Sequence, residues 1–203
     1  MKPTDILSQE HRVIEQVLDC LERMADRAAT EHTVDESAAR QAIDFFRNFA
    51  DHCHHAKEES HLFPAMEARG FPRDCGPTGV MLREHELGRD YIRAAEEAVG
   101  PAASGDEQAT RRFVQAARQY IGLLREHIQK EDHCLFSMAN QAFSDEDQHR
   151  LLEAFQRVEA QQMGLGTHEK FLKIADDLAT RYGVPREVTM AASHQGCGCS
   201  HHE

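Results

Sequence analysis

Two stretches of the sequence share one pattern, a His followed four residues later by a Glu, and then by Leu-Phe. The first stretch contains His54 and Glu58, and the second contains His127 and Glu131. Residues four apart lie on the same face of an α-helix, one turn from each other. Each stretch therefore points an imidazole and a carboxylate in the same direction. Two such pairs that face each other inside a helical bundle would form a metal site.

The elements that must position these pairs are helical. Apolar residues recur at helical spacing along nearly the whole chain, and no segment alternates as a strand would. Loops are predicted where Gly, Pro and capping residues gather, at about 28–35, 70–77 and 100–106. The predicted fold class is therefore all-α, an up-down-up-down four-helix bundle with a C-terminal helical extension.

Some helix ends can be predicted from single residues. Thr4 or Asp5 is expected to cap the first helix, and the second is expected to begin near Asp35. The third helix is expected to stop at Gly100 and Pro101. These ends fix the depth at which each helix carries its polar residues.

Two single His residues extend the repeat, since His11 precedes His54 by 43 positions and His85 precedes His127 by 42. In an up-down bundle, residues at one depth on consecutive helices lie at equal distances from the loop between them. The midpoints between these residues all fall in the predicted loops. One depth of the bundle therefore receives six residues, His11, His54, Glu58, His85, His127 and Glu131.

Four imidazoles and two carboxylates at one depth are a ligand set for two transition-metal ions. Two buried carboxylates would be very costly without a cation. If each ion takes two His and both Glu bridge, each ion keeps open positions, which favours non-heme iron. Structural zinc sites are usually closed, often by Cys, and manganese sites use more carboxylates.

Other residues share the spacing or the face of these ligands. His55 and Glu59 are also four apart, about 100° around the helix from the main pair. They are the main rival to the pair of His54 and Glu58 as ligands, but we interpret them as part of a solvated face or as support for the ligands. Glu15 is interpreted as a surface residue, and Tyr120 as a core residue on the ligand face of the fourth helix.

The whole pattern resembles the hemerythrin-like, or HHE cation-binding, domain. The ligand order matches over about residues 1–140, and the segments from Lys57 to Pro64 and from Glu84 to Glu86 are similar to bacterial members. The resemblance implies a four-helix bundle that holds two iron ions joined by an oxo or hydroxo bridge. It also implies a small ligand, namely dioxygen, nitric oxide or peroxide.

Two positions depart from the oxygen-carrying members of that family. Carriers have a further His four residues after the third-helix His, where this chain has Arg89. They also place the fourth-helix acid five residues after its His, which would select Asp132, whereas the internal repeat selects Glu131. The ligand set is more similar to the iron-centre repair proteins of nitrosative stress, although their additional Cys-containing N-terminal domain is not in this sequence. Redox or nitric oxide chemistry is therefore expected in place of reversible oxygen carriage.

The composition excludes several classes of partner. The chain has 23 Lys and Arg against 35 Asp and Glu, a formal charge of −12, whereas nucleic acid and anionic membranes require a basic surface. No apolar run reaches the roughly 18–20 residues that span a bilayer, and the first residues lack the apolar region of a signal peptide. We therefore expect a cytoplasmic protein whose six Cys are free thiols.

Three regions are predicted along the chain. Residues 1–140 form the metal-binding bundle, 141–183 a helical pair, and 184–203 a flexible tail that contains Cys and His. A capping signal at Ser144 begins the first helix of the pair, which is expected to end near position 162. The pair either packs on the bundle or forms a homodimer contact, and metal binding by the tail stays open.

The resulting hypothesis is a di-iron protein that binds oxygen, nitric oxide or peroxide in a redox or nitrosative stress response or in sensing. Two alternatives remain, an iron storage or donation protein and a zinc-stabilised bundle without catalysis. The sequence leaves open whether the protein is an enzyme. Iron binding is the part of the hypothesis that the ligand pattern supports most directly.

Overall fold

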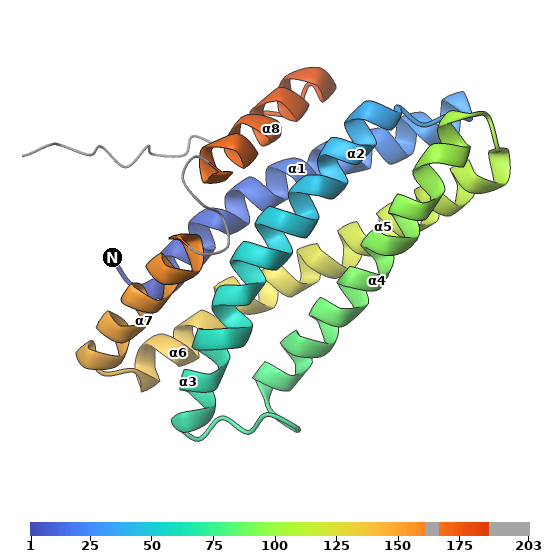
Figure 1. Ribbon diagram of the computed structural model, residues 1–203. Helices are drawn as coiled ribbons and strands as arrows, with labels where there is room; N and C mark the ends of the chain where they lie inside the picture. Colours follow the sequence, from blue (N-terminus) through green and yellow to red (C-terminus); the bar gives the residue numbers. More distant parts are fainter. Residues whose placement is uncertain (161–166, 187–203) are drawn as a thin grey trace, which may run out of the picture.

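The structure is a computed structural model that describes residues 1–160 and 167–186. Within these ranges the chain is helical apart from short connections, and it forms no β-strand. The all-helical prediction is therefore confirmed. Long helices lie side by side (Figure 1), with α1 packed against α2 and α5, and α4 packed against α2 and α5.

The first half of the chain forms α1 (Pro3–Glu31), α2 (Glu36–Phe45), α3 (Phe63–Ala68) and α4 (Pro77–Ala103). The second half forms α5 (Glu107–Lys130), α6 (Phe136–Ala142), α7 (Asp145–Val158) and α8 (Thr167–Tyr182). Three wider π-helical segments lie between these helices. Along the chain, η1 (Phe46–His55) and η2 (Glu58–Leu62) lie between α2 and α3, and η3 (Glu131–Leu135) lies between α5 and α6. Such turns are rare and occur often at functional sites, and the apolar periodicity did not predict them.

Several predicted helix ends are confirmed. The Asp35 carboxylate accepts a hydrogen bond from the Ala38 N–H at the start of α2. The Ser144 side chain caps α7 as expected. The stop after α3 is formed by Gly70, whose φ of 95° is the left-handed conformation that favours glycine at a helix end.

Two predicted ends are wrong. The first helix begins at Pro3, with Lys2 in the capping position, because proline lacks the N–H that a first helical residue would leave unpaired. Asp5 instead accepts a hydrogen bond from the Lys2 N–H at 2.7 Å. Helix α4 continues through Pro101 to Ala103. The residue before this proline is a glycine, which has no Cβ to clash with the ring, so the helix can continue for a last turn.

Two hydrophobic clusters flank the polar residues along the helices. The main core includes Leu18, Phe46, Leu124 and residues of α8 such as Phe171 and Leu178. The small core is formed around the two Leu-Phe pairs of the repeat, with residues of α7, and its largest members are Leu62, Phe63, Leu135, Phe136 and Phe155. Five of the six predicted ligands lie between the two clusters in sequence, and His127 lies between Leu124 and Ile128 of the main core, so apolar packing on both sides fixes their depth.

Helix α8 packs on α1 and α2, and α7 packs on α1 and η2. The division into a bundle of 1–140 and an extension of 141–183 stays a prediction, although α8 shares the main core with the long helices. The predicted helix end near 162 and the tail residues Cys197 and Cys199 lie outside the described residues. The described cysteines are free thiols, and among the described helices none has the length and apolar character needed to cross a membrane.

Candidate metal centre

The structure brings all six residues of the predicted ligand set together in the interior. Each has a relative exposure of 2% or less. They come from six elements, His11 from α1, His54 from η1, Glu58 from η2, His85 from α4, His127 from α5 and Glu131 from η3. The imidazoles meet in two pairs, in each of which the Nε2 atoms are 3.1 Å apart, His11 with His54 and His85 with His127.

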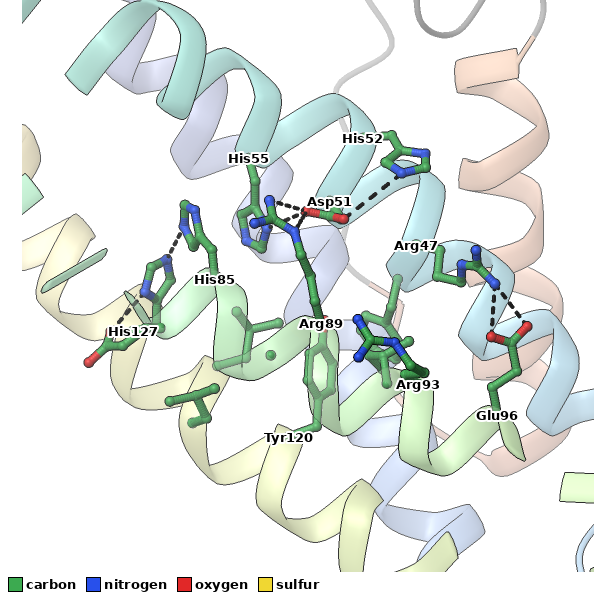
Figure 2. Close-up of a pocket in the computed structure, with 16 residues that line it drawn as sticks. Arg47, Asp51, His52, His55, His85, Arg89, Arg93, Glu96, Tyr120 and His127 are labelled. Carbon is green, nitrogen blue, oxygen red and sulfur yellow. Dashed lines mark hydrogen bonds and ion pairs between the residues drawn. The ribbon is translucent and has the colours of Figure 1, made fainter. Parts of the chain in front are cut away.

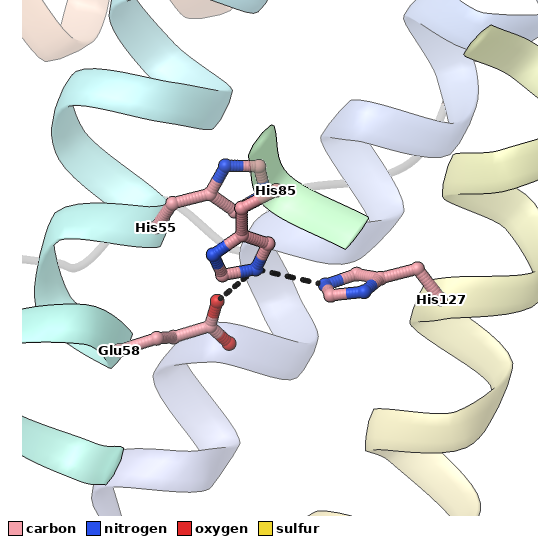
Figure 3. A group of neighbouring side chains, drawn as sticks. All are labelled: His55, Glu58, His85 and His127. Atoms are coloured by element: carbon pink, nitrogen blue, oxygen red, sulfur yellow. Dashed lines mark hydrogen bonds and ion pairs between the residues drawn. The ribbon is translucent and has the colours of Figure 1, made fainter. Parts of the chain in front are cut away.

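Together with His55, these residues form two groups, in each of which the ligand atoms lie within 4.8 Å of one another. The first ligand group is His11, His54, Glu58 and Glu131. The second ligand group is His55, Glu58, His85 and His127, which Figure 3 shows converging from three helices. Each group contains imidazole nitrogen and carboxylate oxygen, a donor set that suits a transition-metal ion.

The two carboxylates lie between the pairs of imidazoles. Glu58 has one oxygen 3.7 Å from His54 Nε2 and the other 3.5 Å from His85 Nε2. Glu131 has Oε2 3.3 Å from His11 Nε2 and 3.2 Å from His127 Nε2. Each carboxylate thus reaches one His of each pair, so both would be in position to bridge if each pair held a metal ion.

Each of the four imidazoles also meets a second carboxylate at Nδ1. The Nδ1–O distances are 2.9 Å for His11–Asp132, 2.9 Å for His54–Glu10, 2.7 Å for His85–Glu59 and 2.9 Å for His127–Glu84. An ionised carboxylate can only accept a hydrogen bond, so the imidazole donates from Nδ1, and in its neutral form it keeps its lone pair on Nε2. This is the usual arrangement around a His that binds a metal.

The same contacts give different positions to Glu131 and Asp132, the two acids between which the sequence could not choose. Asp132 accepts hydrogen bonds from His11 Nδ1 and from Ser8, and it lies behind the His11 ring. Glu131, in contrast, presents its carboxylate to the Nε2 atoms. The geometry therefore places Glu131 on the inner side of the site and Asp132 in support of His11.

A cation pairs with each supporting carboxylate. These ion pairs are Lys57 with Glu10, Lys130 with Glu84, Arg12 with Asp132 and Arg89 with Glu59. Although burial opposes its ionisation, the charge of Lys57 and the hydrogen bond from His54 lower the pKa of Glu10 to about 2. Glu10 thus stays ionised, and each supporting carboxylate holds the imidazole that it contacts through Nδ1.

The two inner carboxylates, Glu58 and Glu131, have no Lys or Arg partner of this kind among the described residues. All four oxygens of Glu58 and Glu131 are buried and accept no hydrogen bond from any described residue. Burial and, next, the charge of Glu131 raise the pKa of Glu58 well above its ordinary value. Unpaired buried carboxylates are very costly, and a cation between them would remove that cost. These residues therefore fit a pair of metal ions.

For His55, one of the two sequence interpretations, a solvated face, is wrong. It is buried, at 5% exposure, and its ring stacks on that of His85 with centroids 3.8 Å apart. It is therefore not part of a solvated face. The π-helical turn of η1 explains the difference, because it breaks the regular spacing on which that interpretation rested. Its partner in spacing, Glu59, does support a predicted ligand as expected, namely His85.

A cavity of about 200 Å³ adjoins the second ligand group (Figure 2). A single water needs only roughly 10–15 Å³ on this measure, so a small ligand has ample room. Tyr120 lines the cavity and is buried in the core as predicted, with its ring 4.9 Å from that of Phe46. Arg89 also lines it and joins Asp51 and Glu59 through its guanidinium.

Comparison with known proteins agrees with this geometry. An uncharacterised protein of Mycobacterium bovis and two uncharacterised proteins from strains of Mycobacterium tuberculosis are each 23% identical over 182 residues, 90% of this chain and 70% of each relative. No solved structure matches with significance. The profile of the hemerythrin HHE cation-binding domain matches residues 2–139, a range that includes both halves of the internal repeat. The chain therefore belongs to the hemerythrin HHE cation-binding family.

Proposed function

We propose that the protein is a non-heme di-iron protein that binds oxygen, nitric oxide or peroxide. Two iron ions would be held by His11, His54, Glu58, His85, His127 and Glu131. The observation that carries this proposal is the set of four buried, unpartnered oxygens of Glu58 and Glu131. Three of these oxygens, both of Glu58 and Oε2 of Glu131, lie 3.2–3.7 Å from the Nε2 atoms of the imidazoles.

The donor set favours iron over other metals. It combines imidazole nitrogen with carboxylate oxygen and includes no thiolate, whereas structural zinc sites usually have four closed positions and often use Cys. Bound iron would supply a redox-active centre that can bind and polarise a small oxygen- or nitrogen-containing ligand. Family membership supports metal binding in this part of the chain.

The role we propose is in the response to redox or nitrosative stress, or in sensing it. The cavity beside the second ligand group gives a small ligand a place next to the metal. The formal charge of −12 disfavours nucleic acid and anionic membranes as partners. We also propose that the long helices form an up-down-up-down bundle and that the protein is cytoplasmic. A homodimer contact through α7 and α8 is part of the same proposal.

Optical spectroscopy of the iron-loaded protein tests this function. Visible absorption that changes under air, peroxide or nitric oxide is the expected result, and a spectrum that stays featureless under all three contradicts it. His54→Ala should lose this absorption. The matched control is His149→Ala on α7, because His149 also precedes a Glu by four residues but is exposed. This control should keep the wild-type spectrum.

A further inference from the structure

The two halves of the repeat differ at one buried position beside the ligands. His55 follows His54, and the equivalent residue after His127 is Ile128, which is also buried. We infer that His55 is a fifth imidazole ligand, bound through Nε2 to the ion that His85 and His127 hold. The two ions would then have unequal ligand sets. This inference rests on the proposed function, because it requires the metal pair.

The first observation is that His55 has a free ligand atom in the right place. Its Nε2 is buried and has no hydrogen-bond partner among the described residues. It belongs to the second ligand group, with Glu58, His85 and His127, whose ligand atoms all lie within 4.8 Å of one another. A buried nitrogen without a partner is costly, and a metal ion would supply that partner.

The second observation is the contact on the other ring nitrogen. His55 Nδ1 lies 3.3 Å from Asp51 Oδ1, so His55 has the same kind of carboxylate partner as the four predicted His ligands. Arg89 in turn holds Asp51, with Nε 2.9 Å from Oδ1. The carboxylate accepts a hydrogen bond from Nδ1–H, which in the neutral ring leaves Nε2 with its lone pair. His55 is thus oriented as a ligand.

The third observation is the position of the ring. It lies parallel to the ring of His85, with an interplanar angle of 14° and centroids 3.8 Å apart. The two residues come from neighbouring helices (Figure 3), and their stacked imidazoles can approach one ion side by side. In the alternative role, a proton donor to a ligand in the cavity, Nε2 would have to carry a proton. The Asp51 contact places the proton on Nδ1 instead.

Anaerobic titration with Fe²⁺ tests the inference in three proteins. These are the wild type, His55→Phe, which keeps an aromatic ring against His85, and His55→Ala. We expect two ions per chain in the wild type. In both variants one ion should bind at least about 10-fold more weakly, the lower end of the effect of losing a residue that only supports a ligand. Added imidazole should restore the affinity in His55→Ala but not in His55→Phe.

Mössbauer spectra of the fully loaded proteins give a second readout. We expect two unequal iron signals in the wild type, which become alike in the variants because each ion then has two imidazoles. The control His149→Phe, which changes an exposed His on α7, should behave as wild type in both experiments.

Unchanged affinities and unchanged iron signals in both variants would overturn the role of His55 and leave the proposed function standing. A wild-type protein that does not bind two ions would instead overturn the proposed function, and this inference with it.

Discussion

The inner residues of the metal centre could be predicted from the sequence because each type and spacing has one physical consequence. A His and a Glu four residues apart share a helix face, and each such pair follows a single His by 42 or 43 positions, which places all six residues at one depth. The supporting carboxylates were harder to predict. Asp132 and Glu59 are adjacent to predicted ligands in sequence, and only the packed helices reveal which imidazole each one contacts.

Neighbouring acids should therefore respond differently to substitution. Asp132→Asn removes the charged acceptor behind His11 but leaves every inner donor in place, so both ions should still bind, about 10–100-fold more weakly. Glu131→Ala removes one of the two bridging carboxylates, so the protein should fail to hold at least one ion. Metal titration of the two variants measures this difference. Equal losses, or a larger loss in Asp132→Asn, would reverse the assignment of the two acids.

The buried ion pair of Lys57 and Glu10 allows a second test at single residues. The Lys57 side chain is 0% exposed, whereas Lys130, its equivalent in the repeat, is 41% exposed. Lys57→Met leaves a buried carboxylate without its cation, which should lower the free energy of unfolding by about 3–5 kcal/mol. Lys130→Met should cost less than about 1 kcal/mol, because water screens that ion pair.

Chemical denaturation of the metal-free proteins measures both Lys variants. The double variant Lys57→Met with Glu10→Gln should regain part of the loss, since it removes the uncompensated charge. If the two Lys variants are equally stable, the burial of Lys57 has no energetic role.

At the level of helices, ends that depend on a local hydrogen bond could be predicted, as at Asp35 and Ser144. The wrong ends, at Pro3 and Pro101, involve prolines whose effect depends on their neighbours. The π-helical turns could not be predicted, because a wide turn is stable only when the rest of the fold compensates for it. Since η1 carries His54 and His55, this limit also explains why a solvated face was one interpretation of His55.

The cap of α7 should have a measurable effect of its own. The Ser144 hydroxyl accepts a hydrogen bond from the Asp147 N–H, and Asp147 accepts one from the Ser144 N–H. Ser144→Ala should therefore lower the free energy of unfolding by about 1 kcal/mol. Ser137→Ala, at an exposed position within α6, is the control and should change stability by less than about 0.5 kcal/mol. A neutral Ser144→Ala would contradict the importance of this cap.

Over the molecule as a whole, α8 is part of the same hydrophobic core as the long helices, because Phe171 and Leu178 are buried in it. The sequence offered two roles for this region, packing on the bundle or forming a dimer contact. The apolar face of α8 is the same in both cases, so periodicity alone could not choose between them. In the structure, α8 packs against α1 and α2 of its own chain.

This packing predicts that α8 and the long helices unfold together. Leu178→Ala should lower the free energy of unfolding by about 2–5 kcal/mol, because the leucine is fully buried and the cavity can close only partly. Leu172→Ala, at a half-buried position of the same helix, should cost less. Thermal unfolding followed by circular dichroism measures both. A separate low-temperature transition in Leu178→Ala would mean that α8 unfolds independently.

The number of metal ions per chain tests the central claim most directly. Metal analysis of the purified protein should find two iron ions per chain, and Glu58→Ala should lose metal because it removes a carboxylate shared by both ligand groups. Glu153→Ala on α7, which changes the exposed Glu of the surface His-x-x-x-Glu pair, should keep both ions. A single zinc ion per chain, with the same content in both variants, would contradict the account.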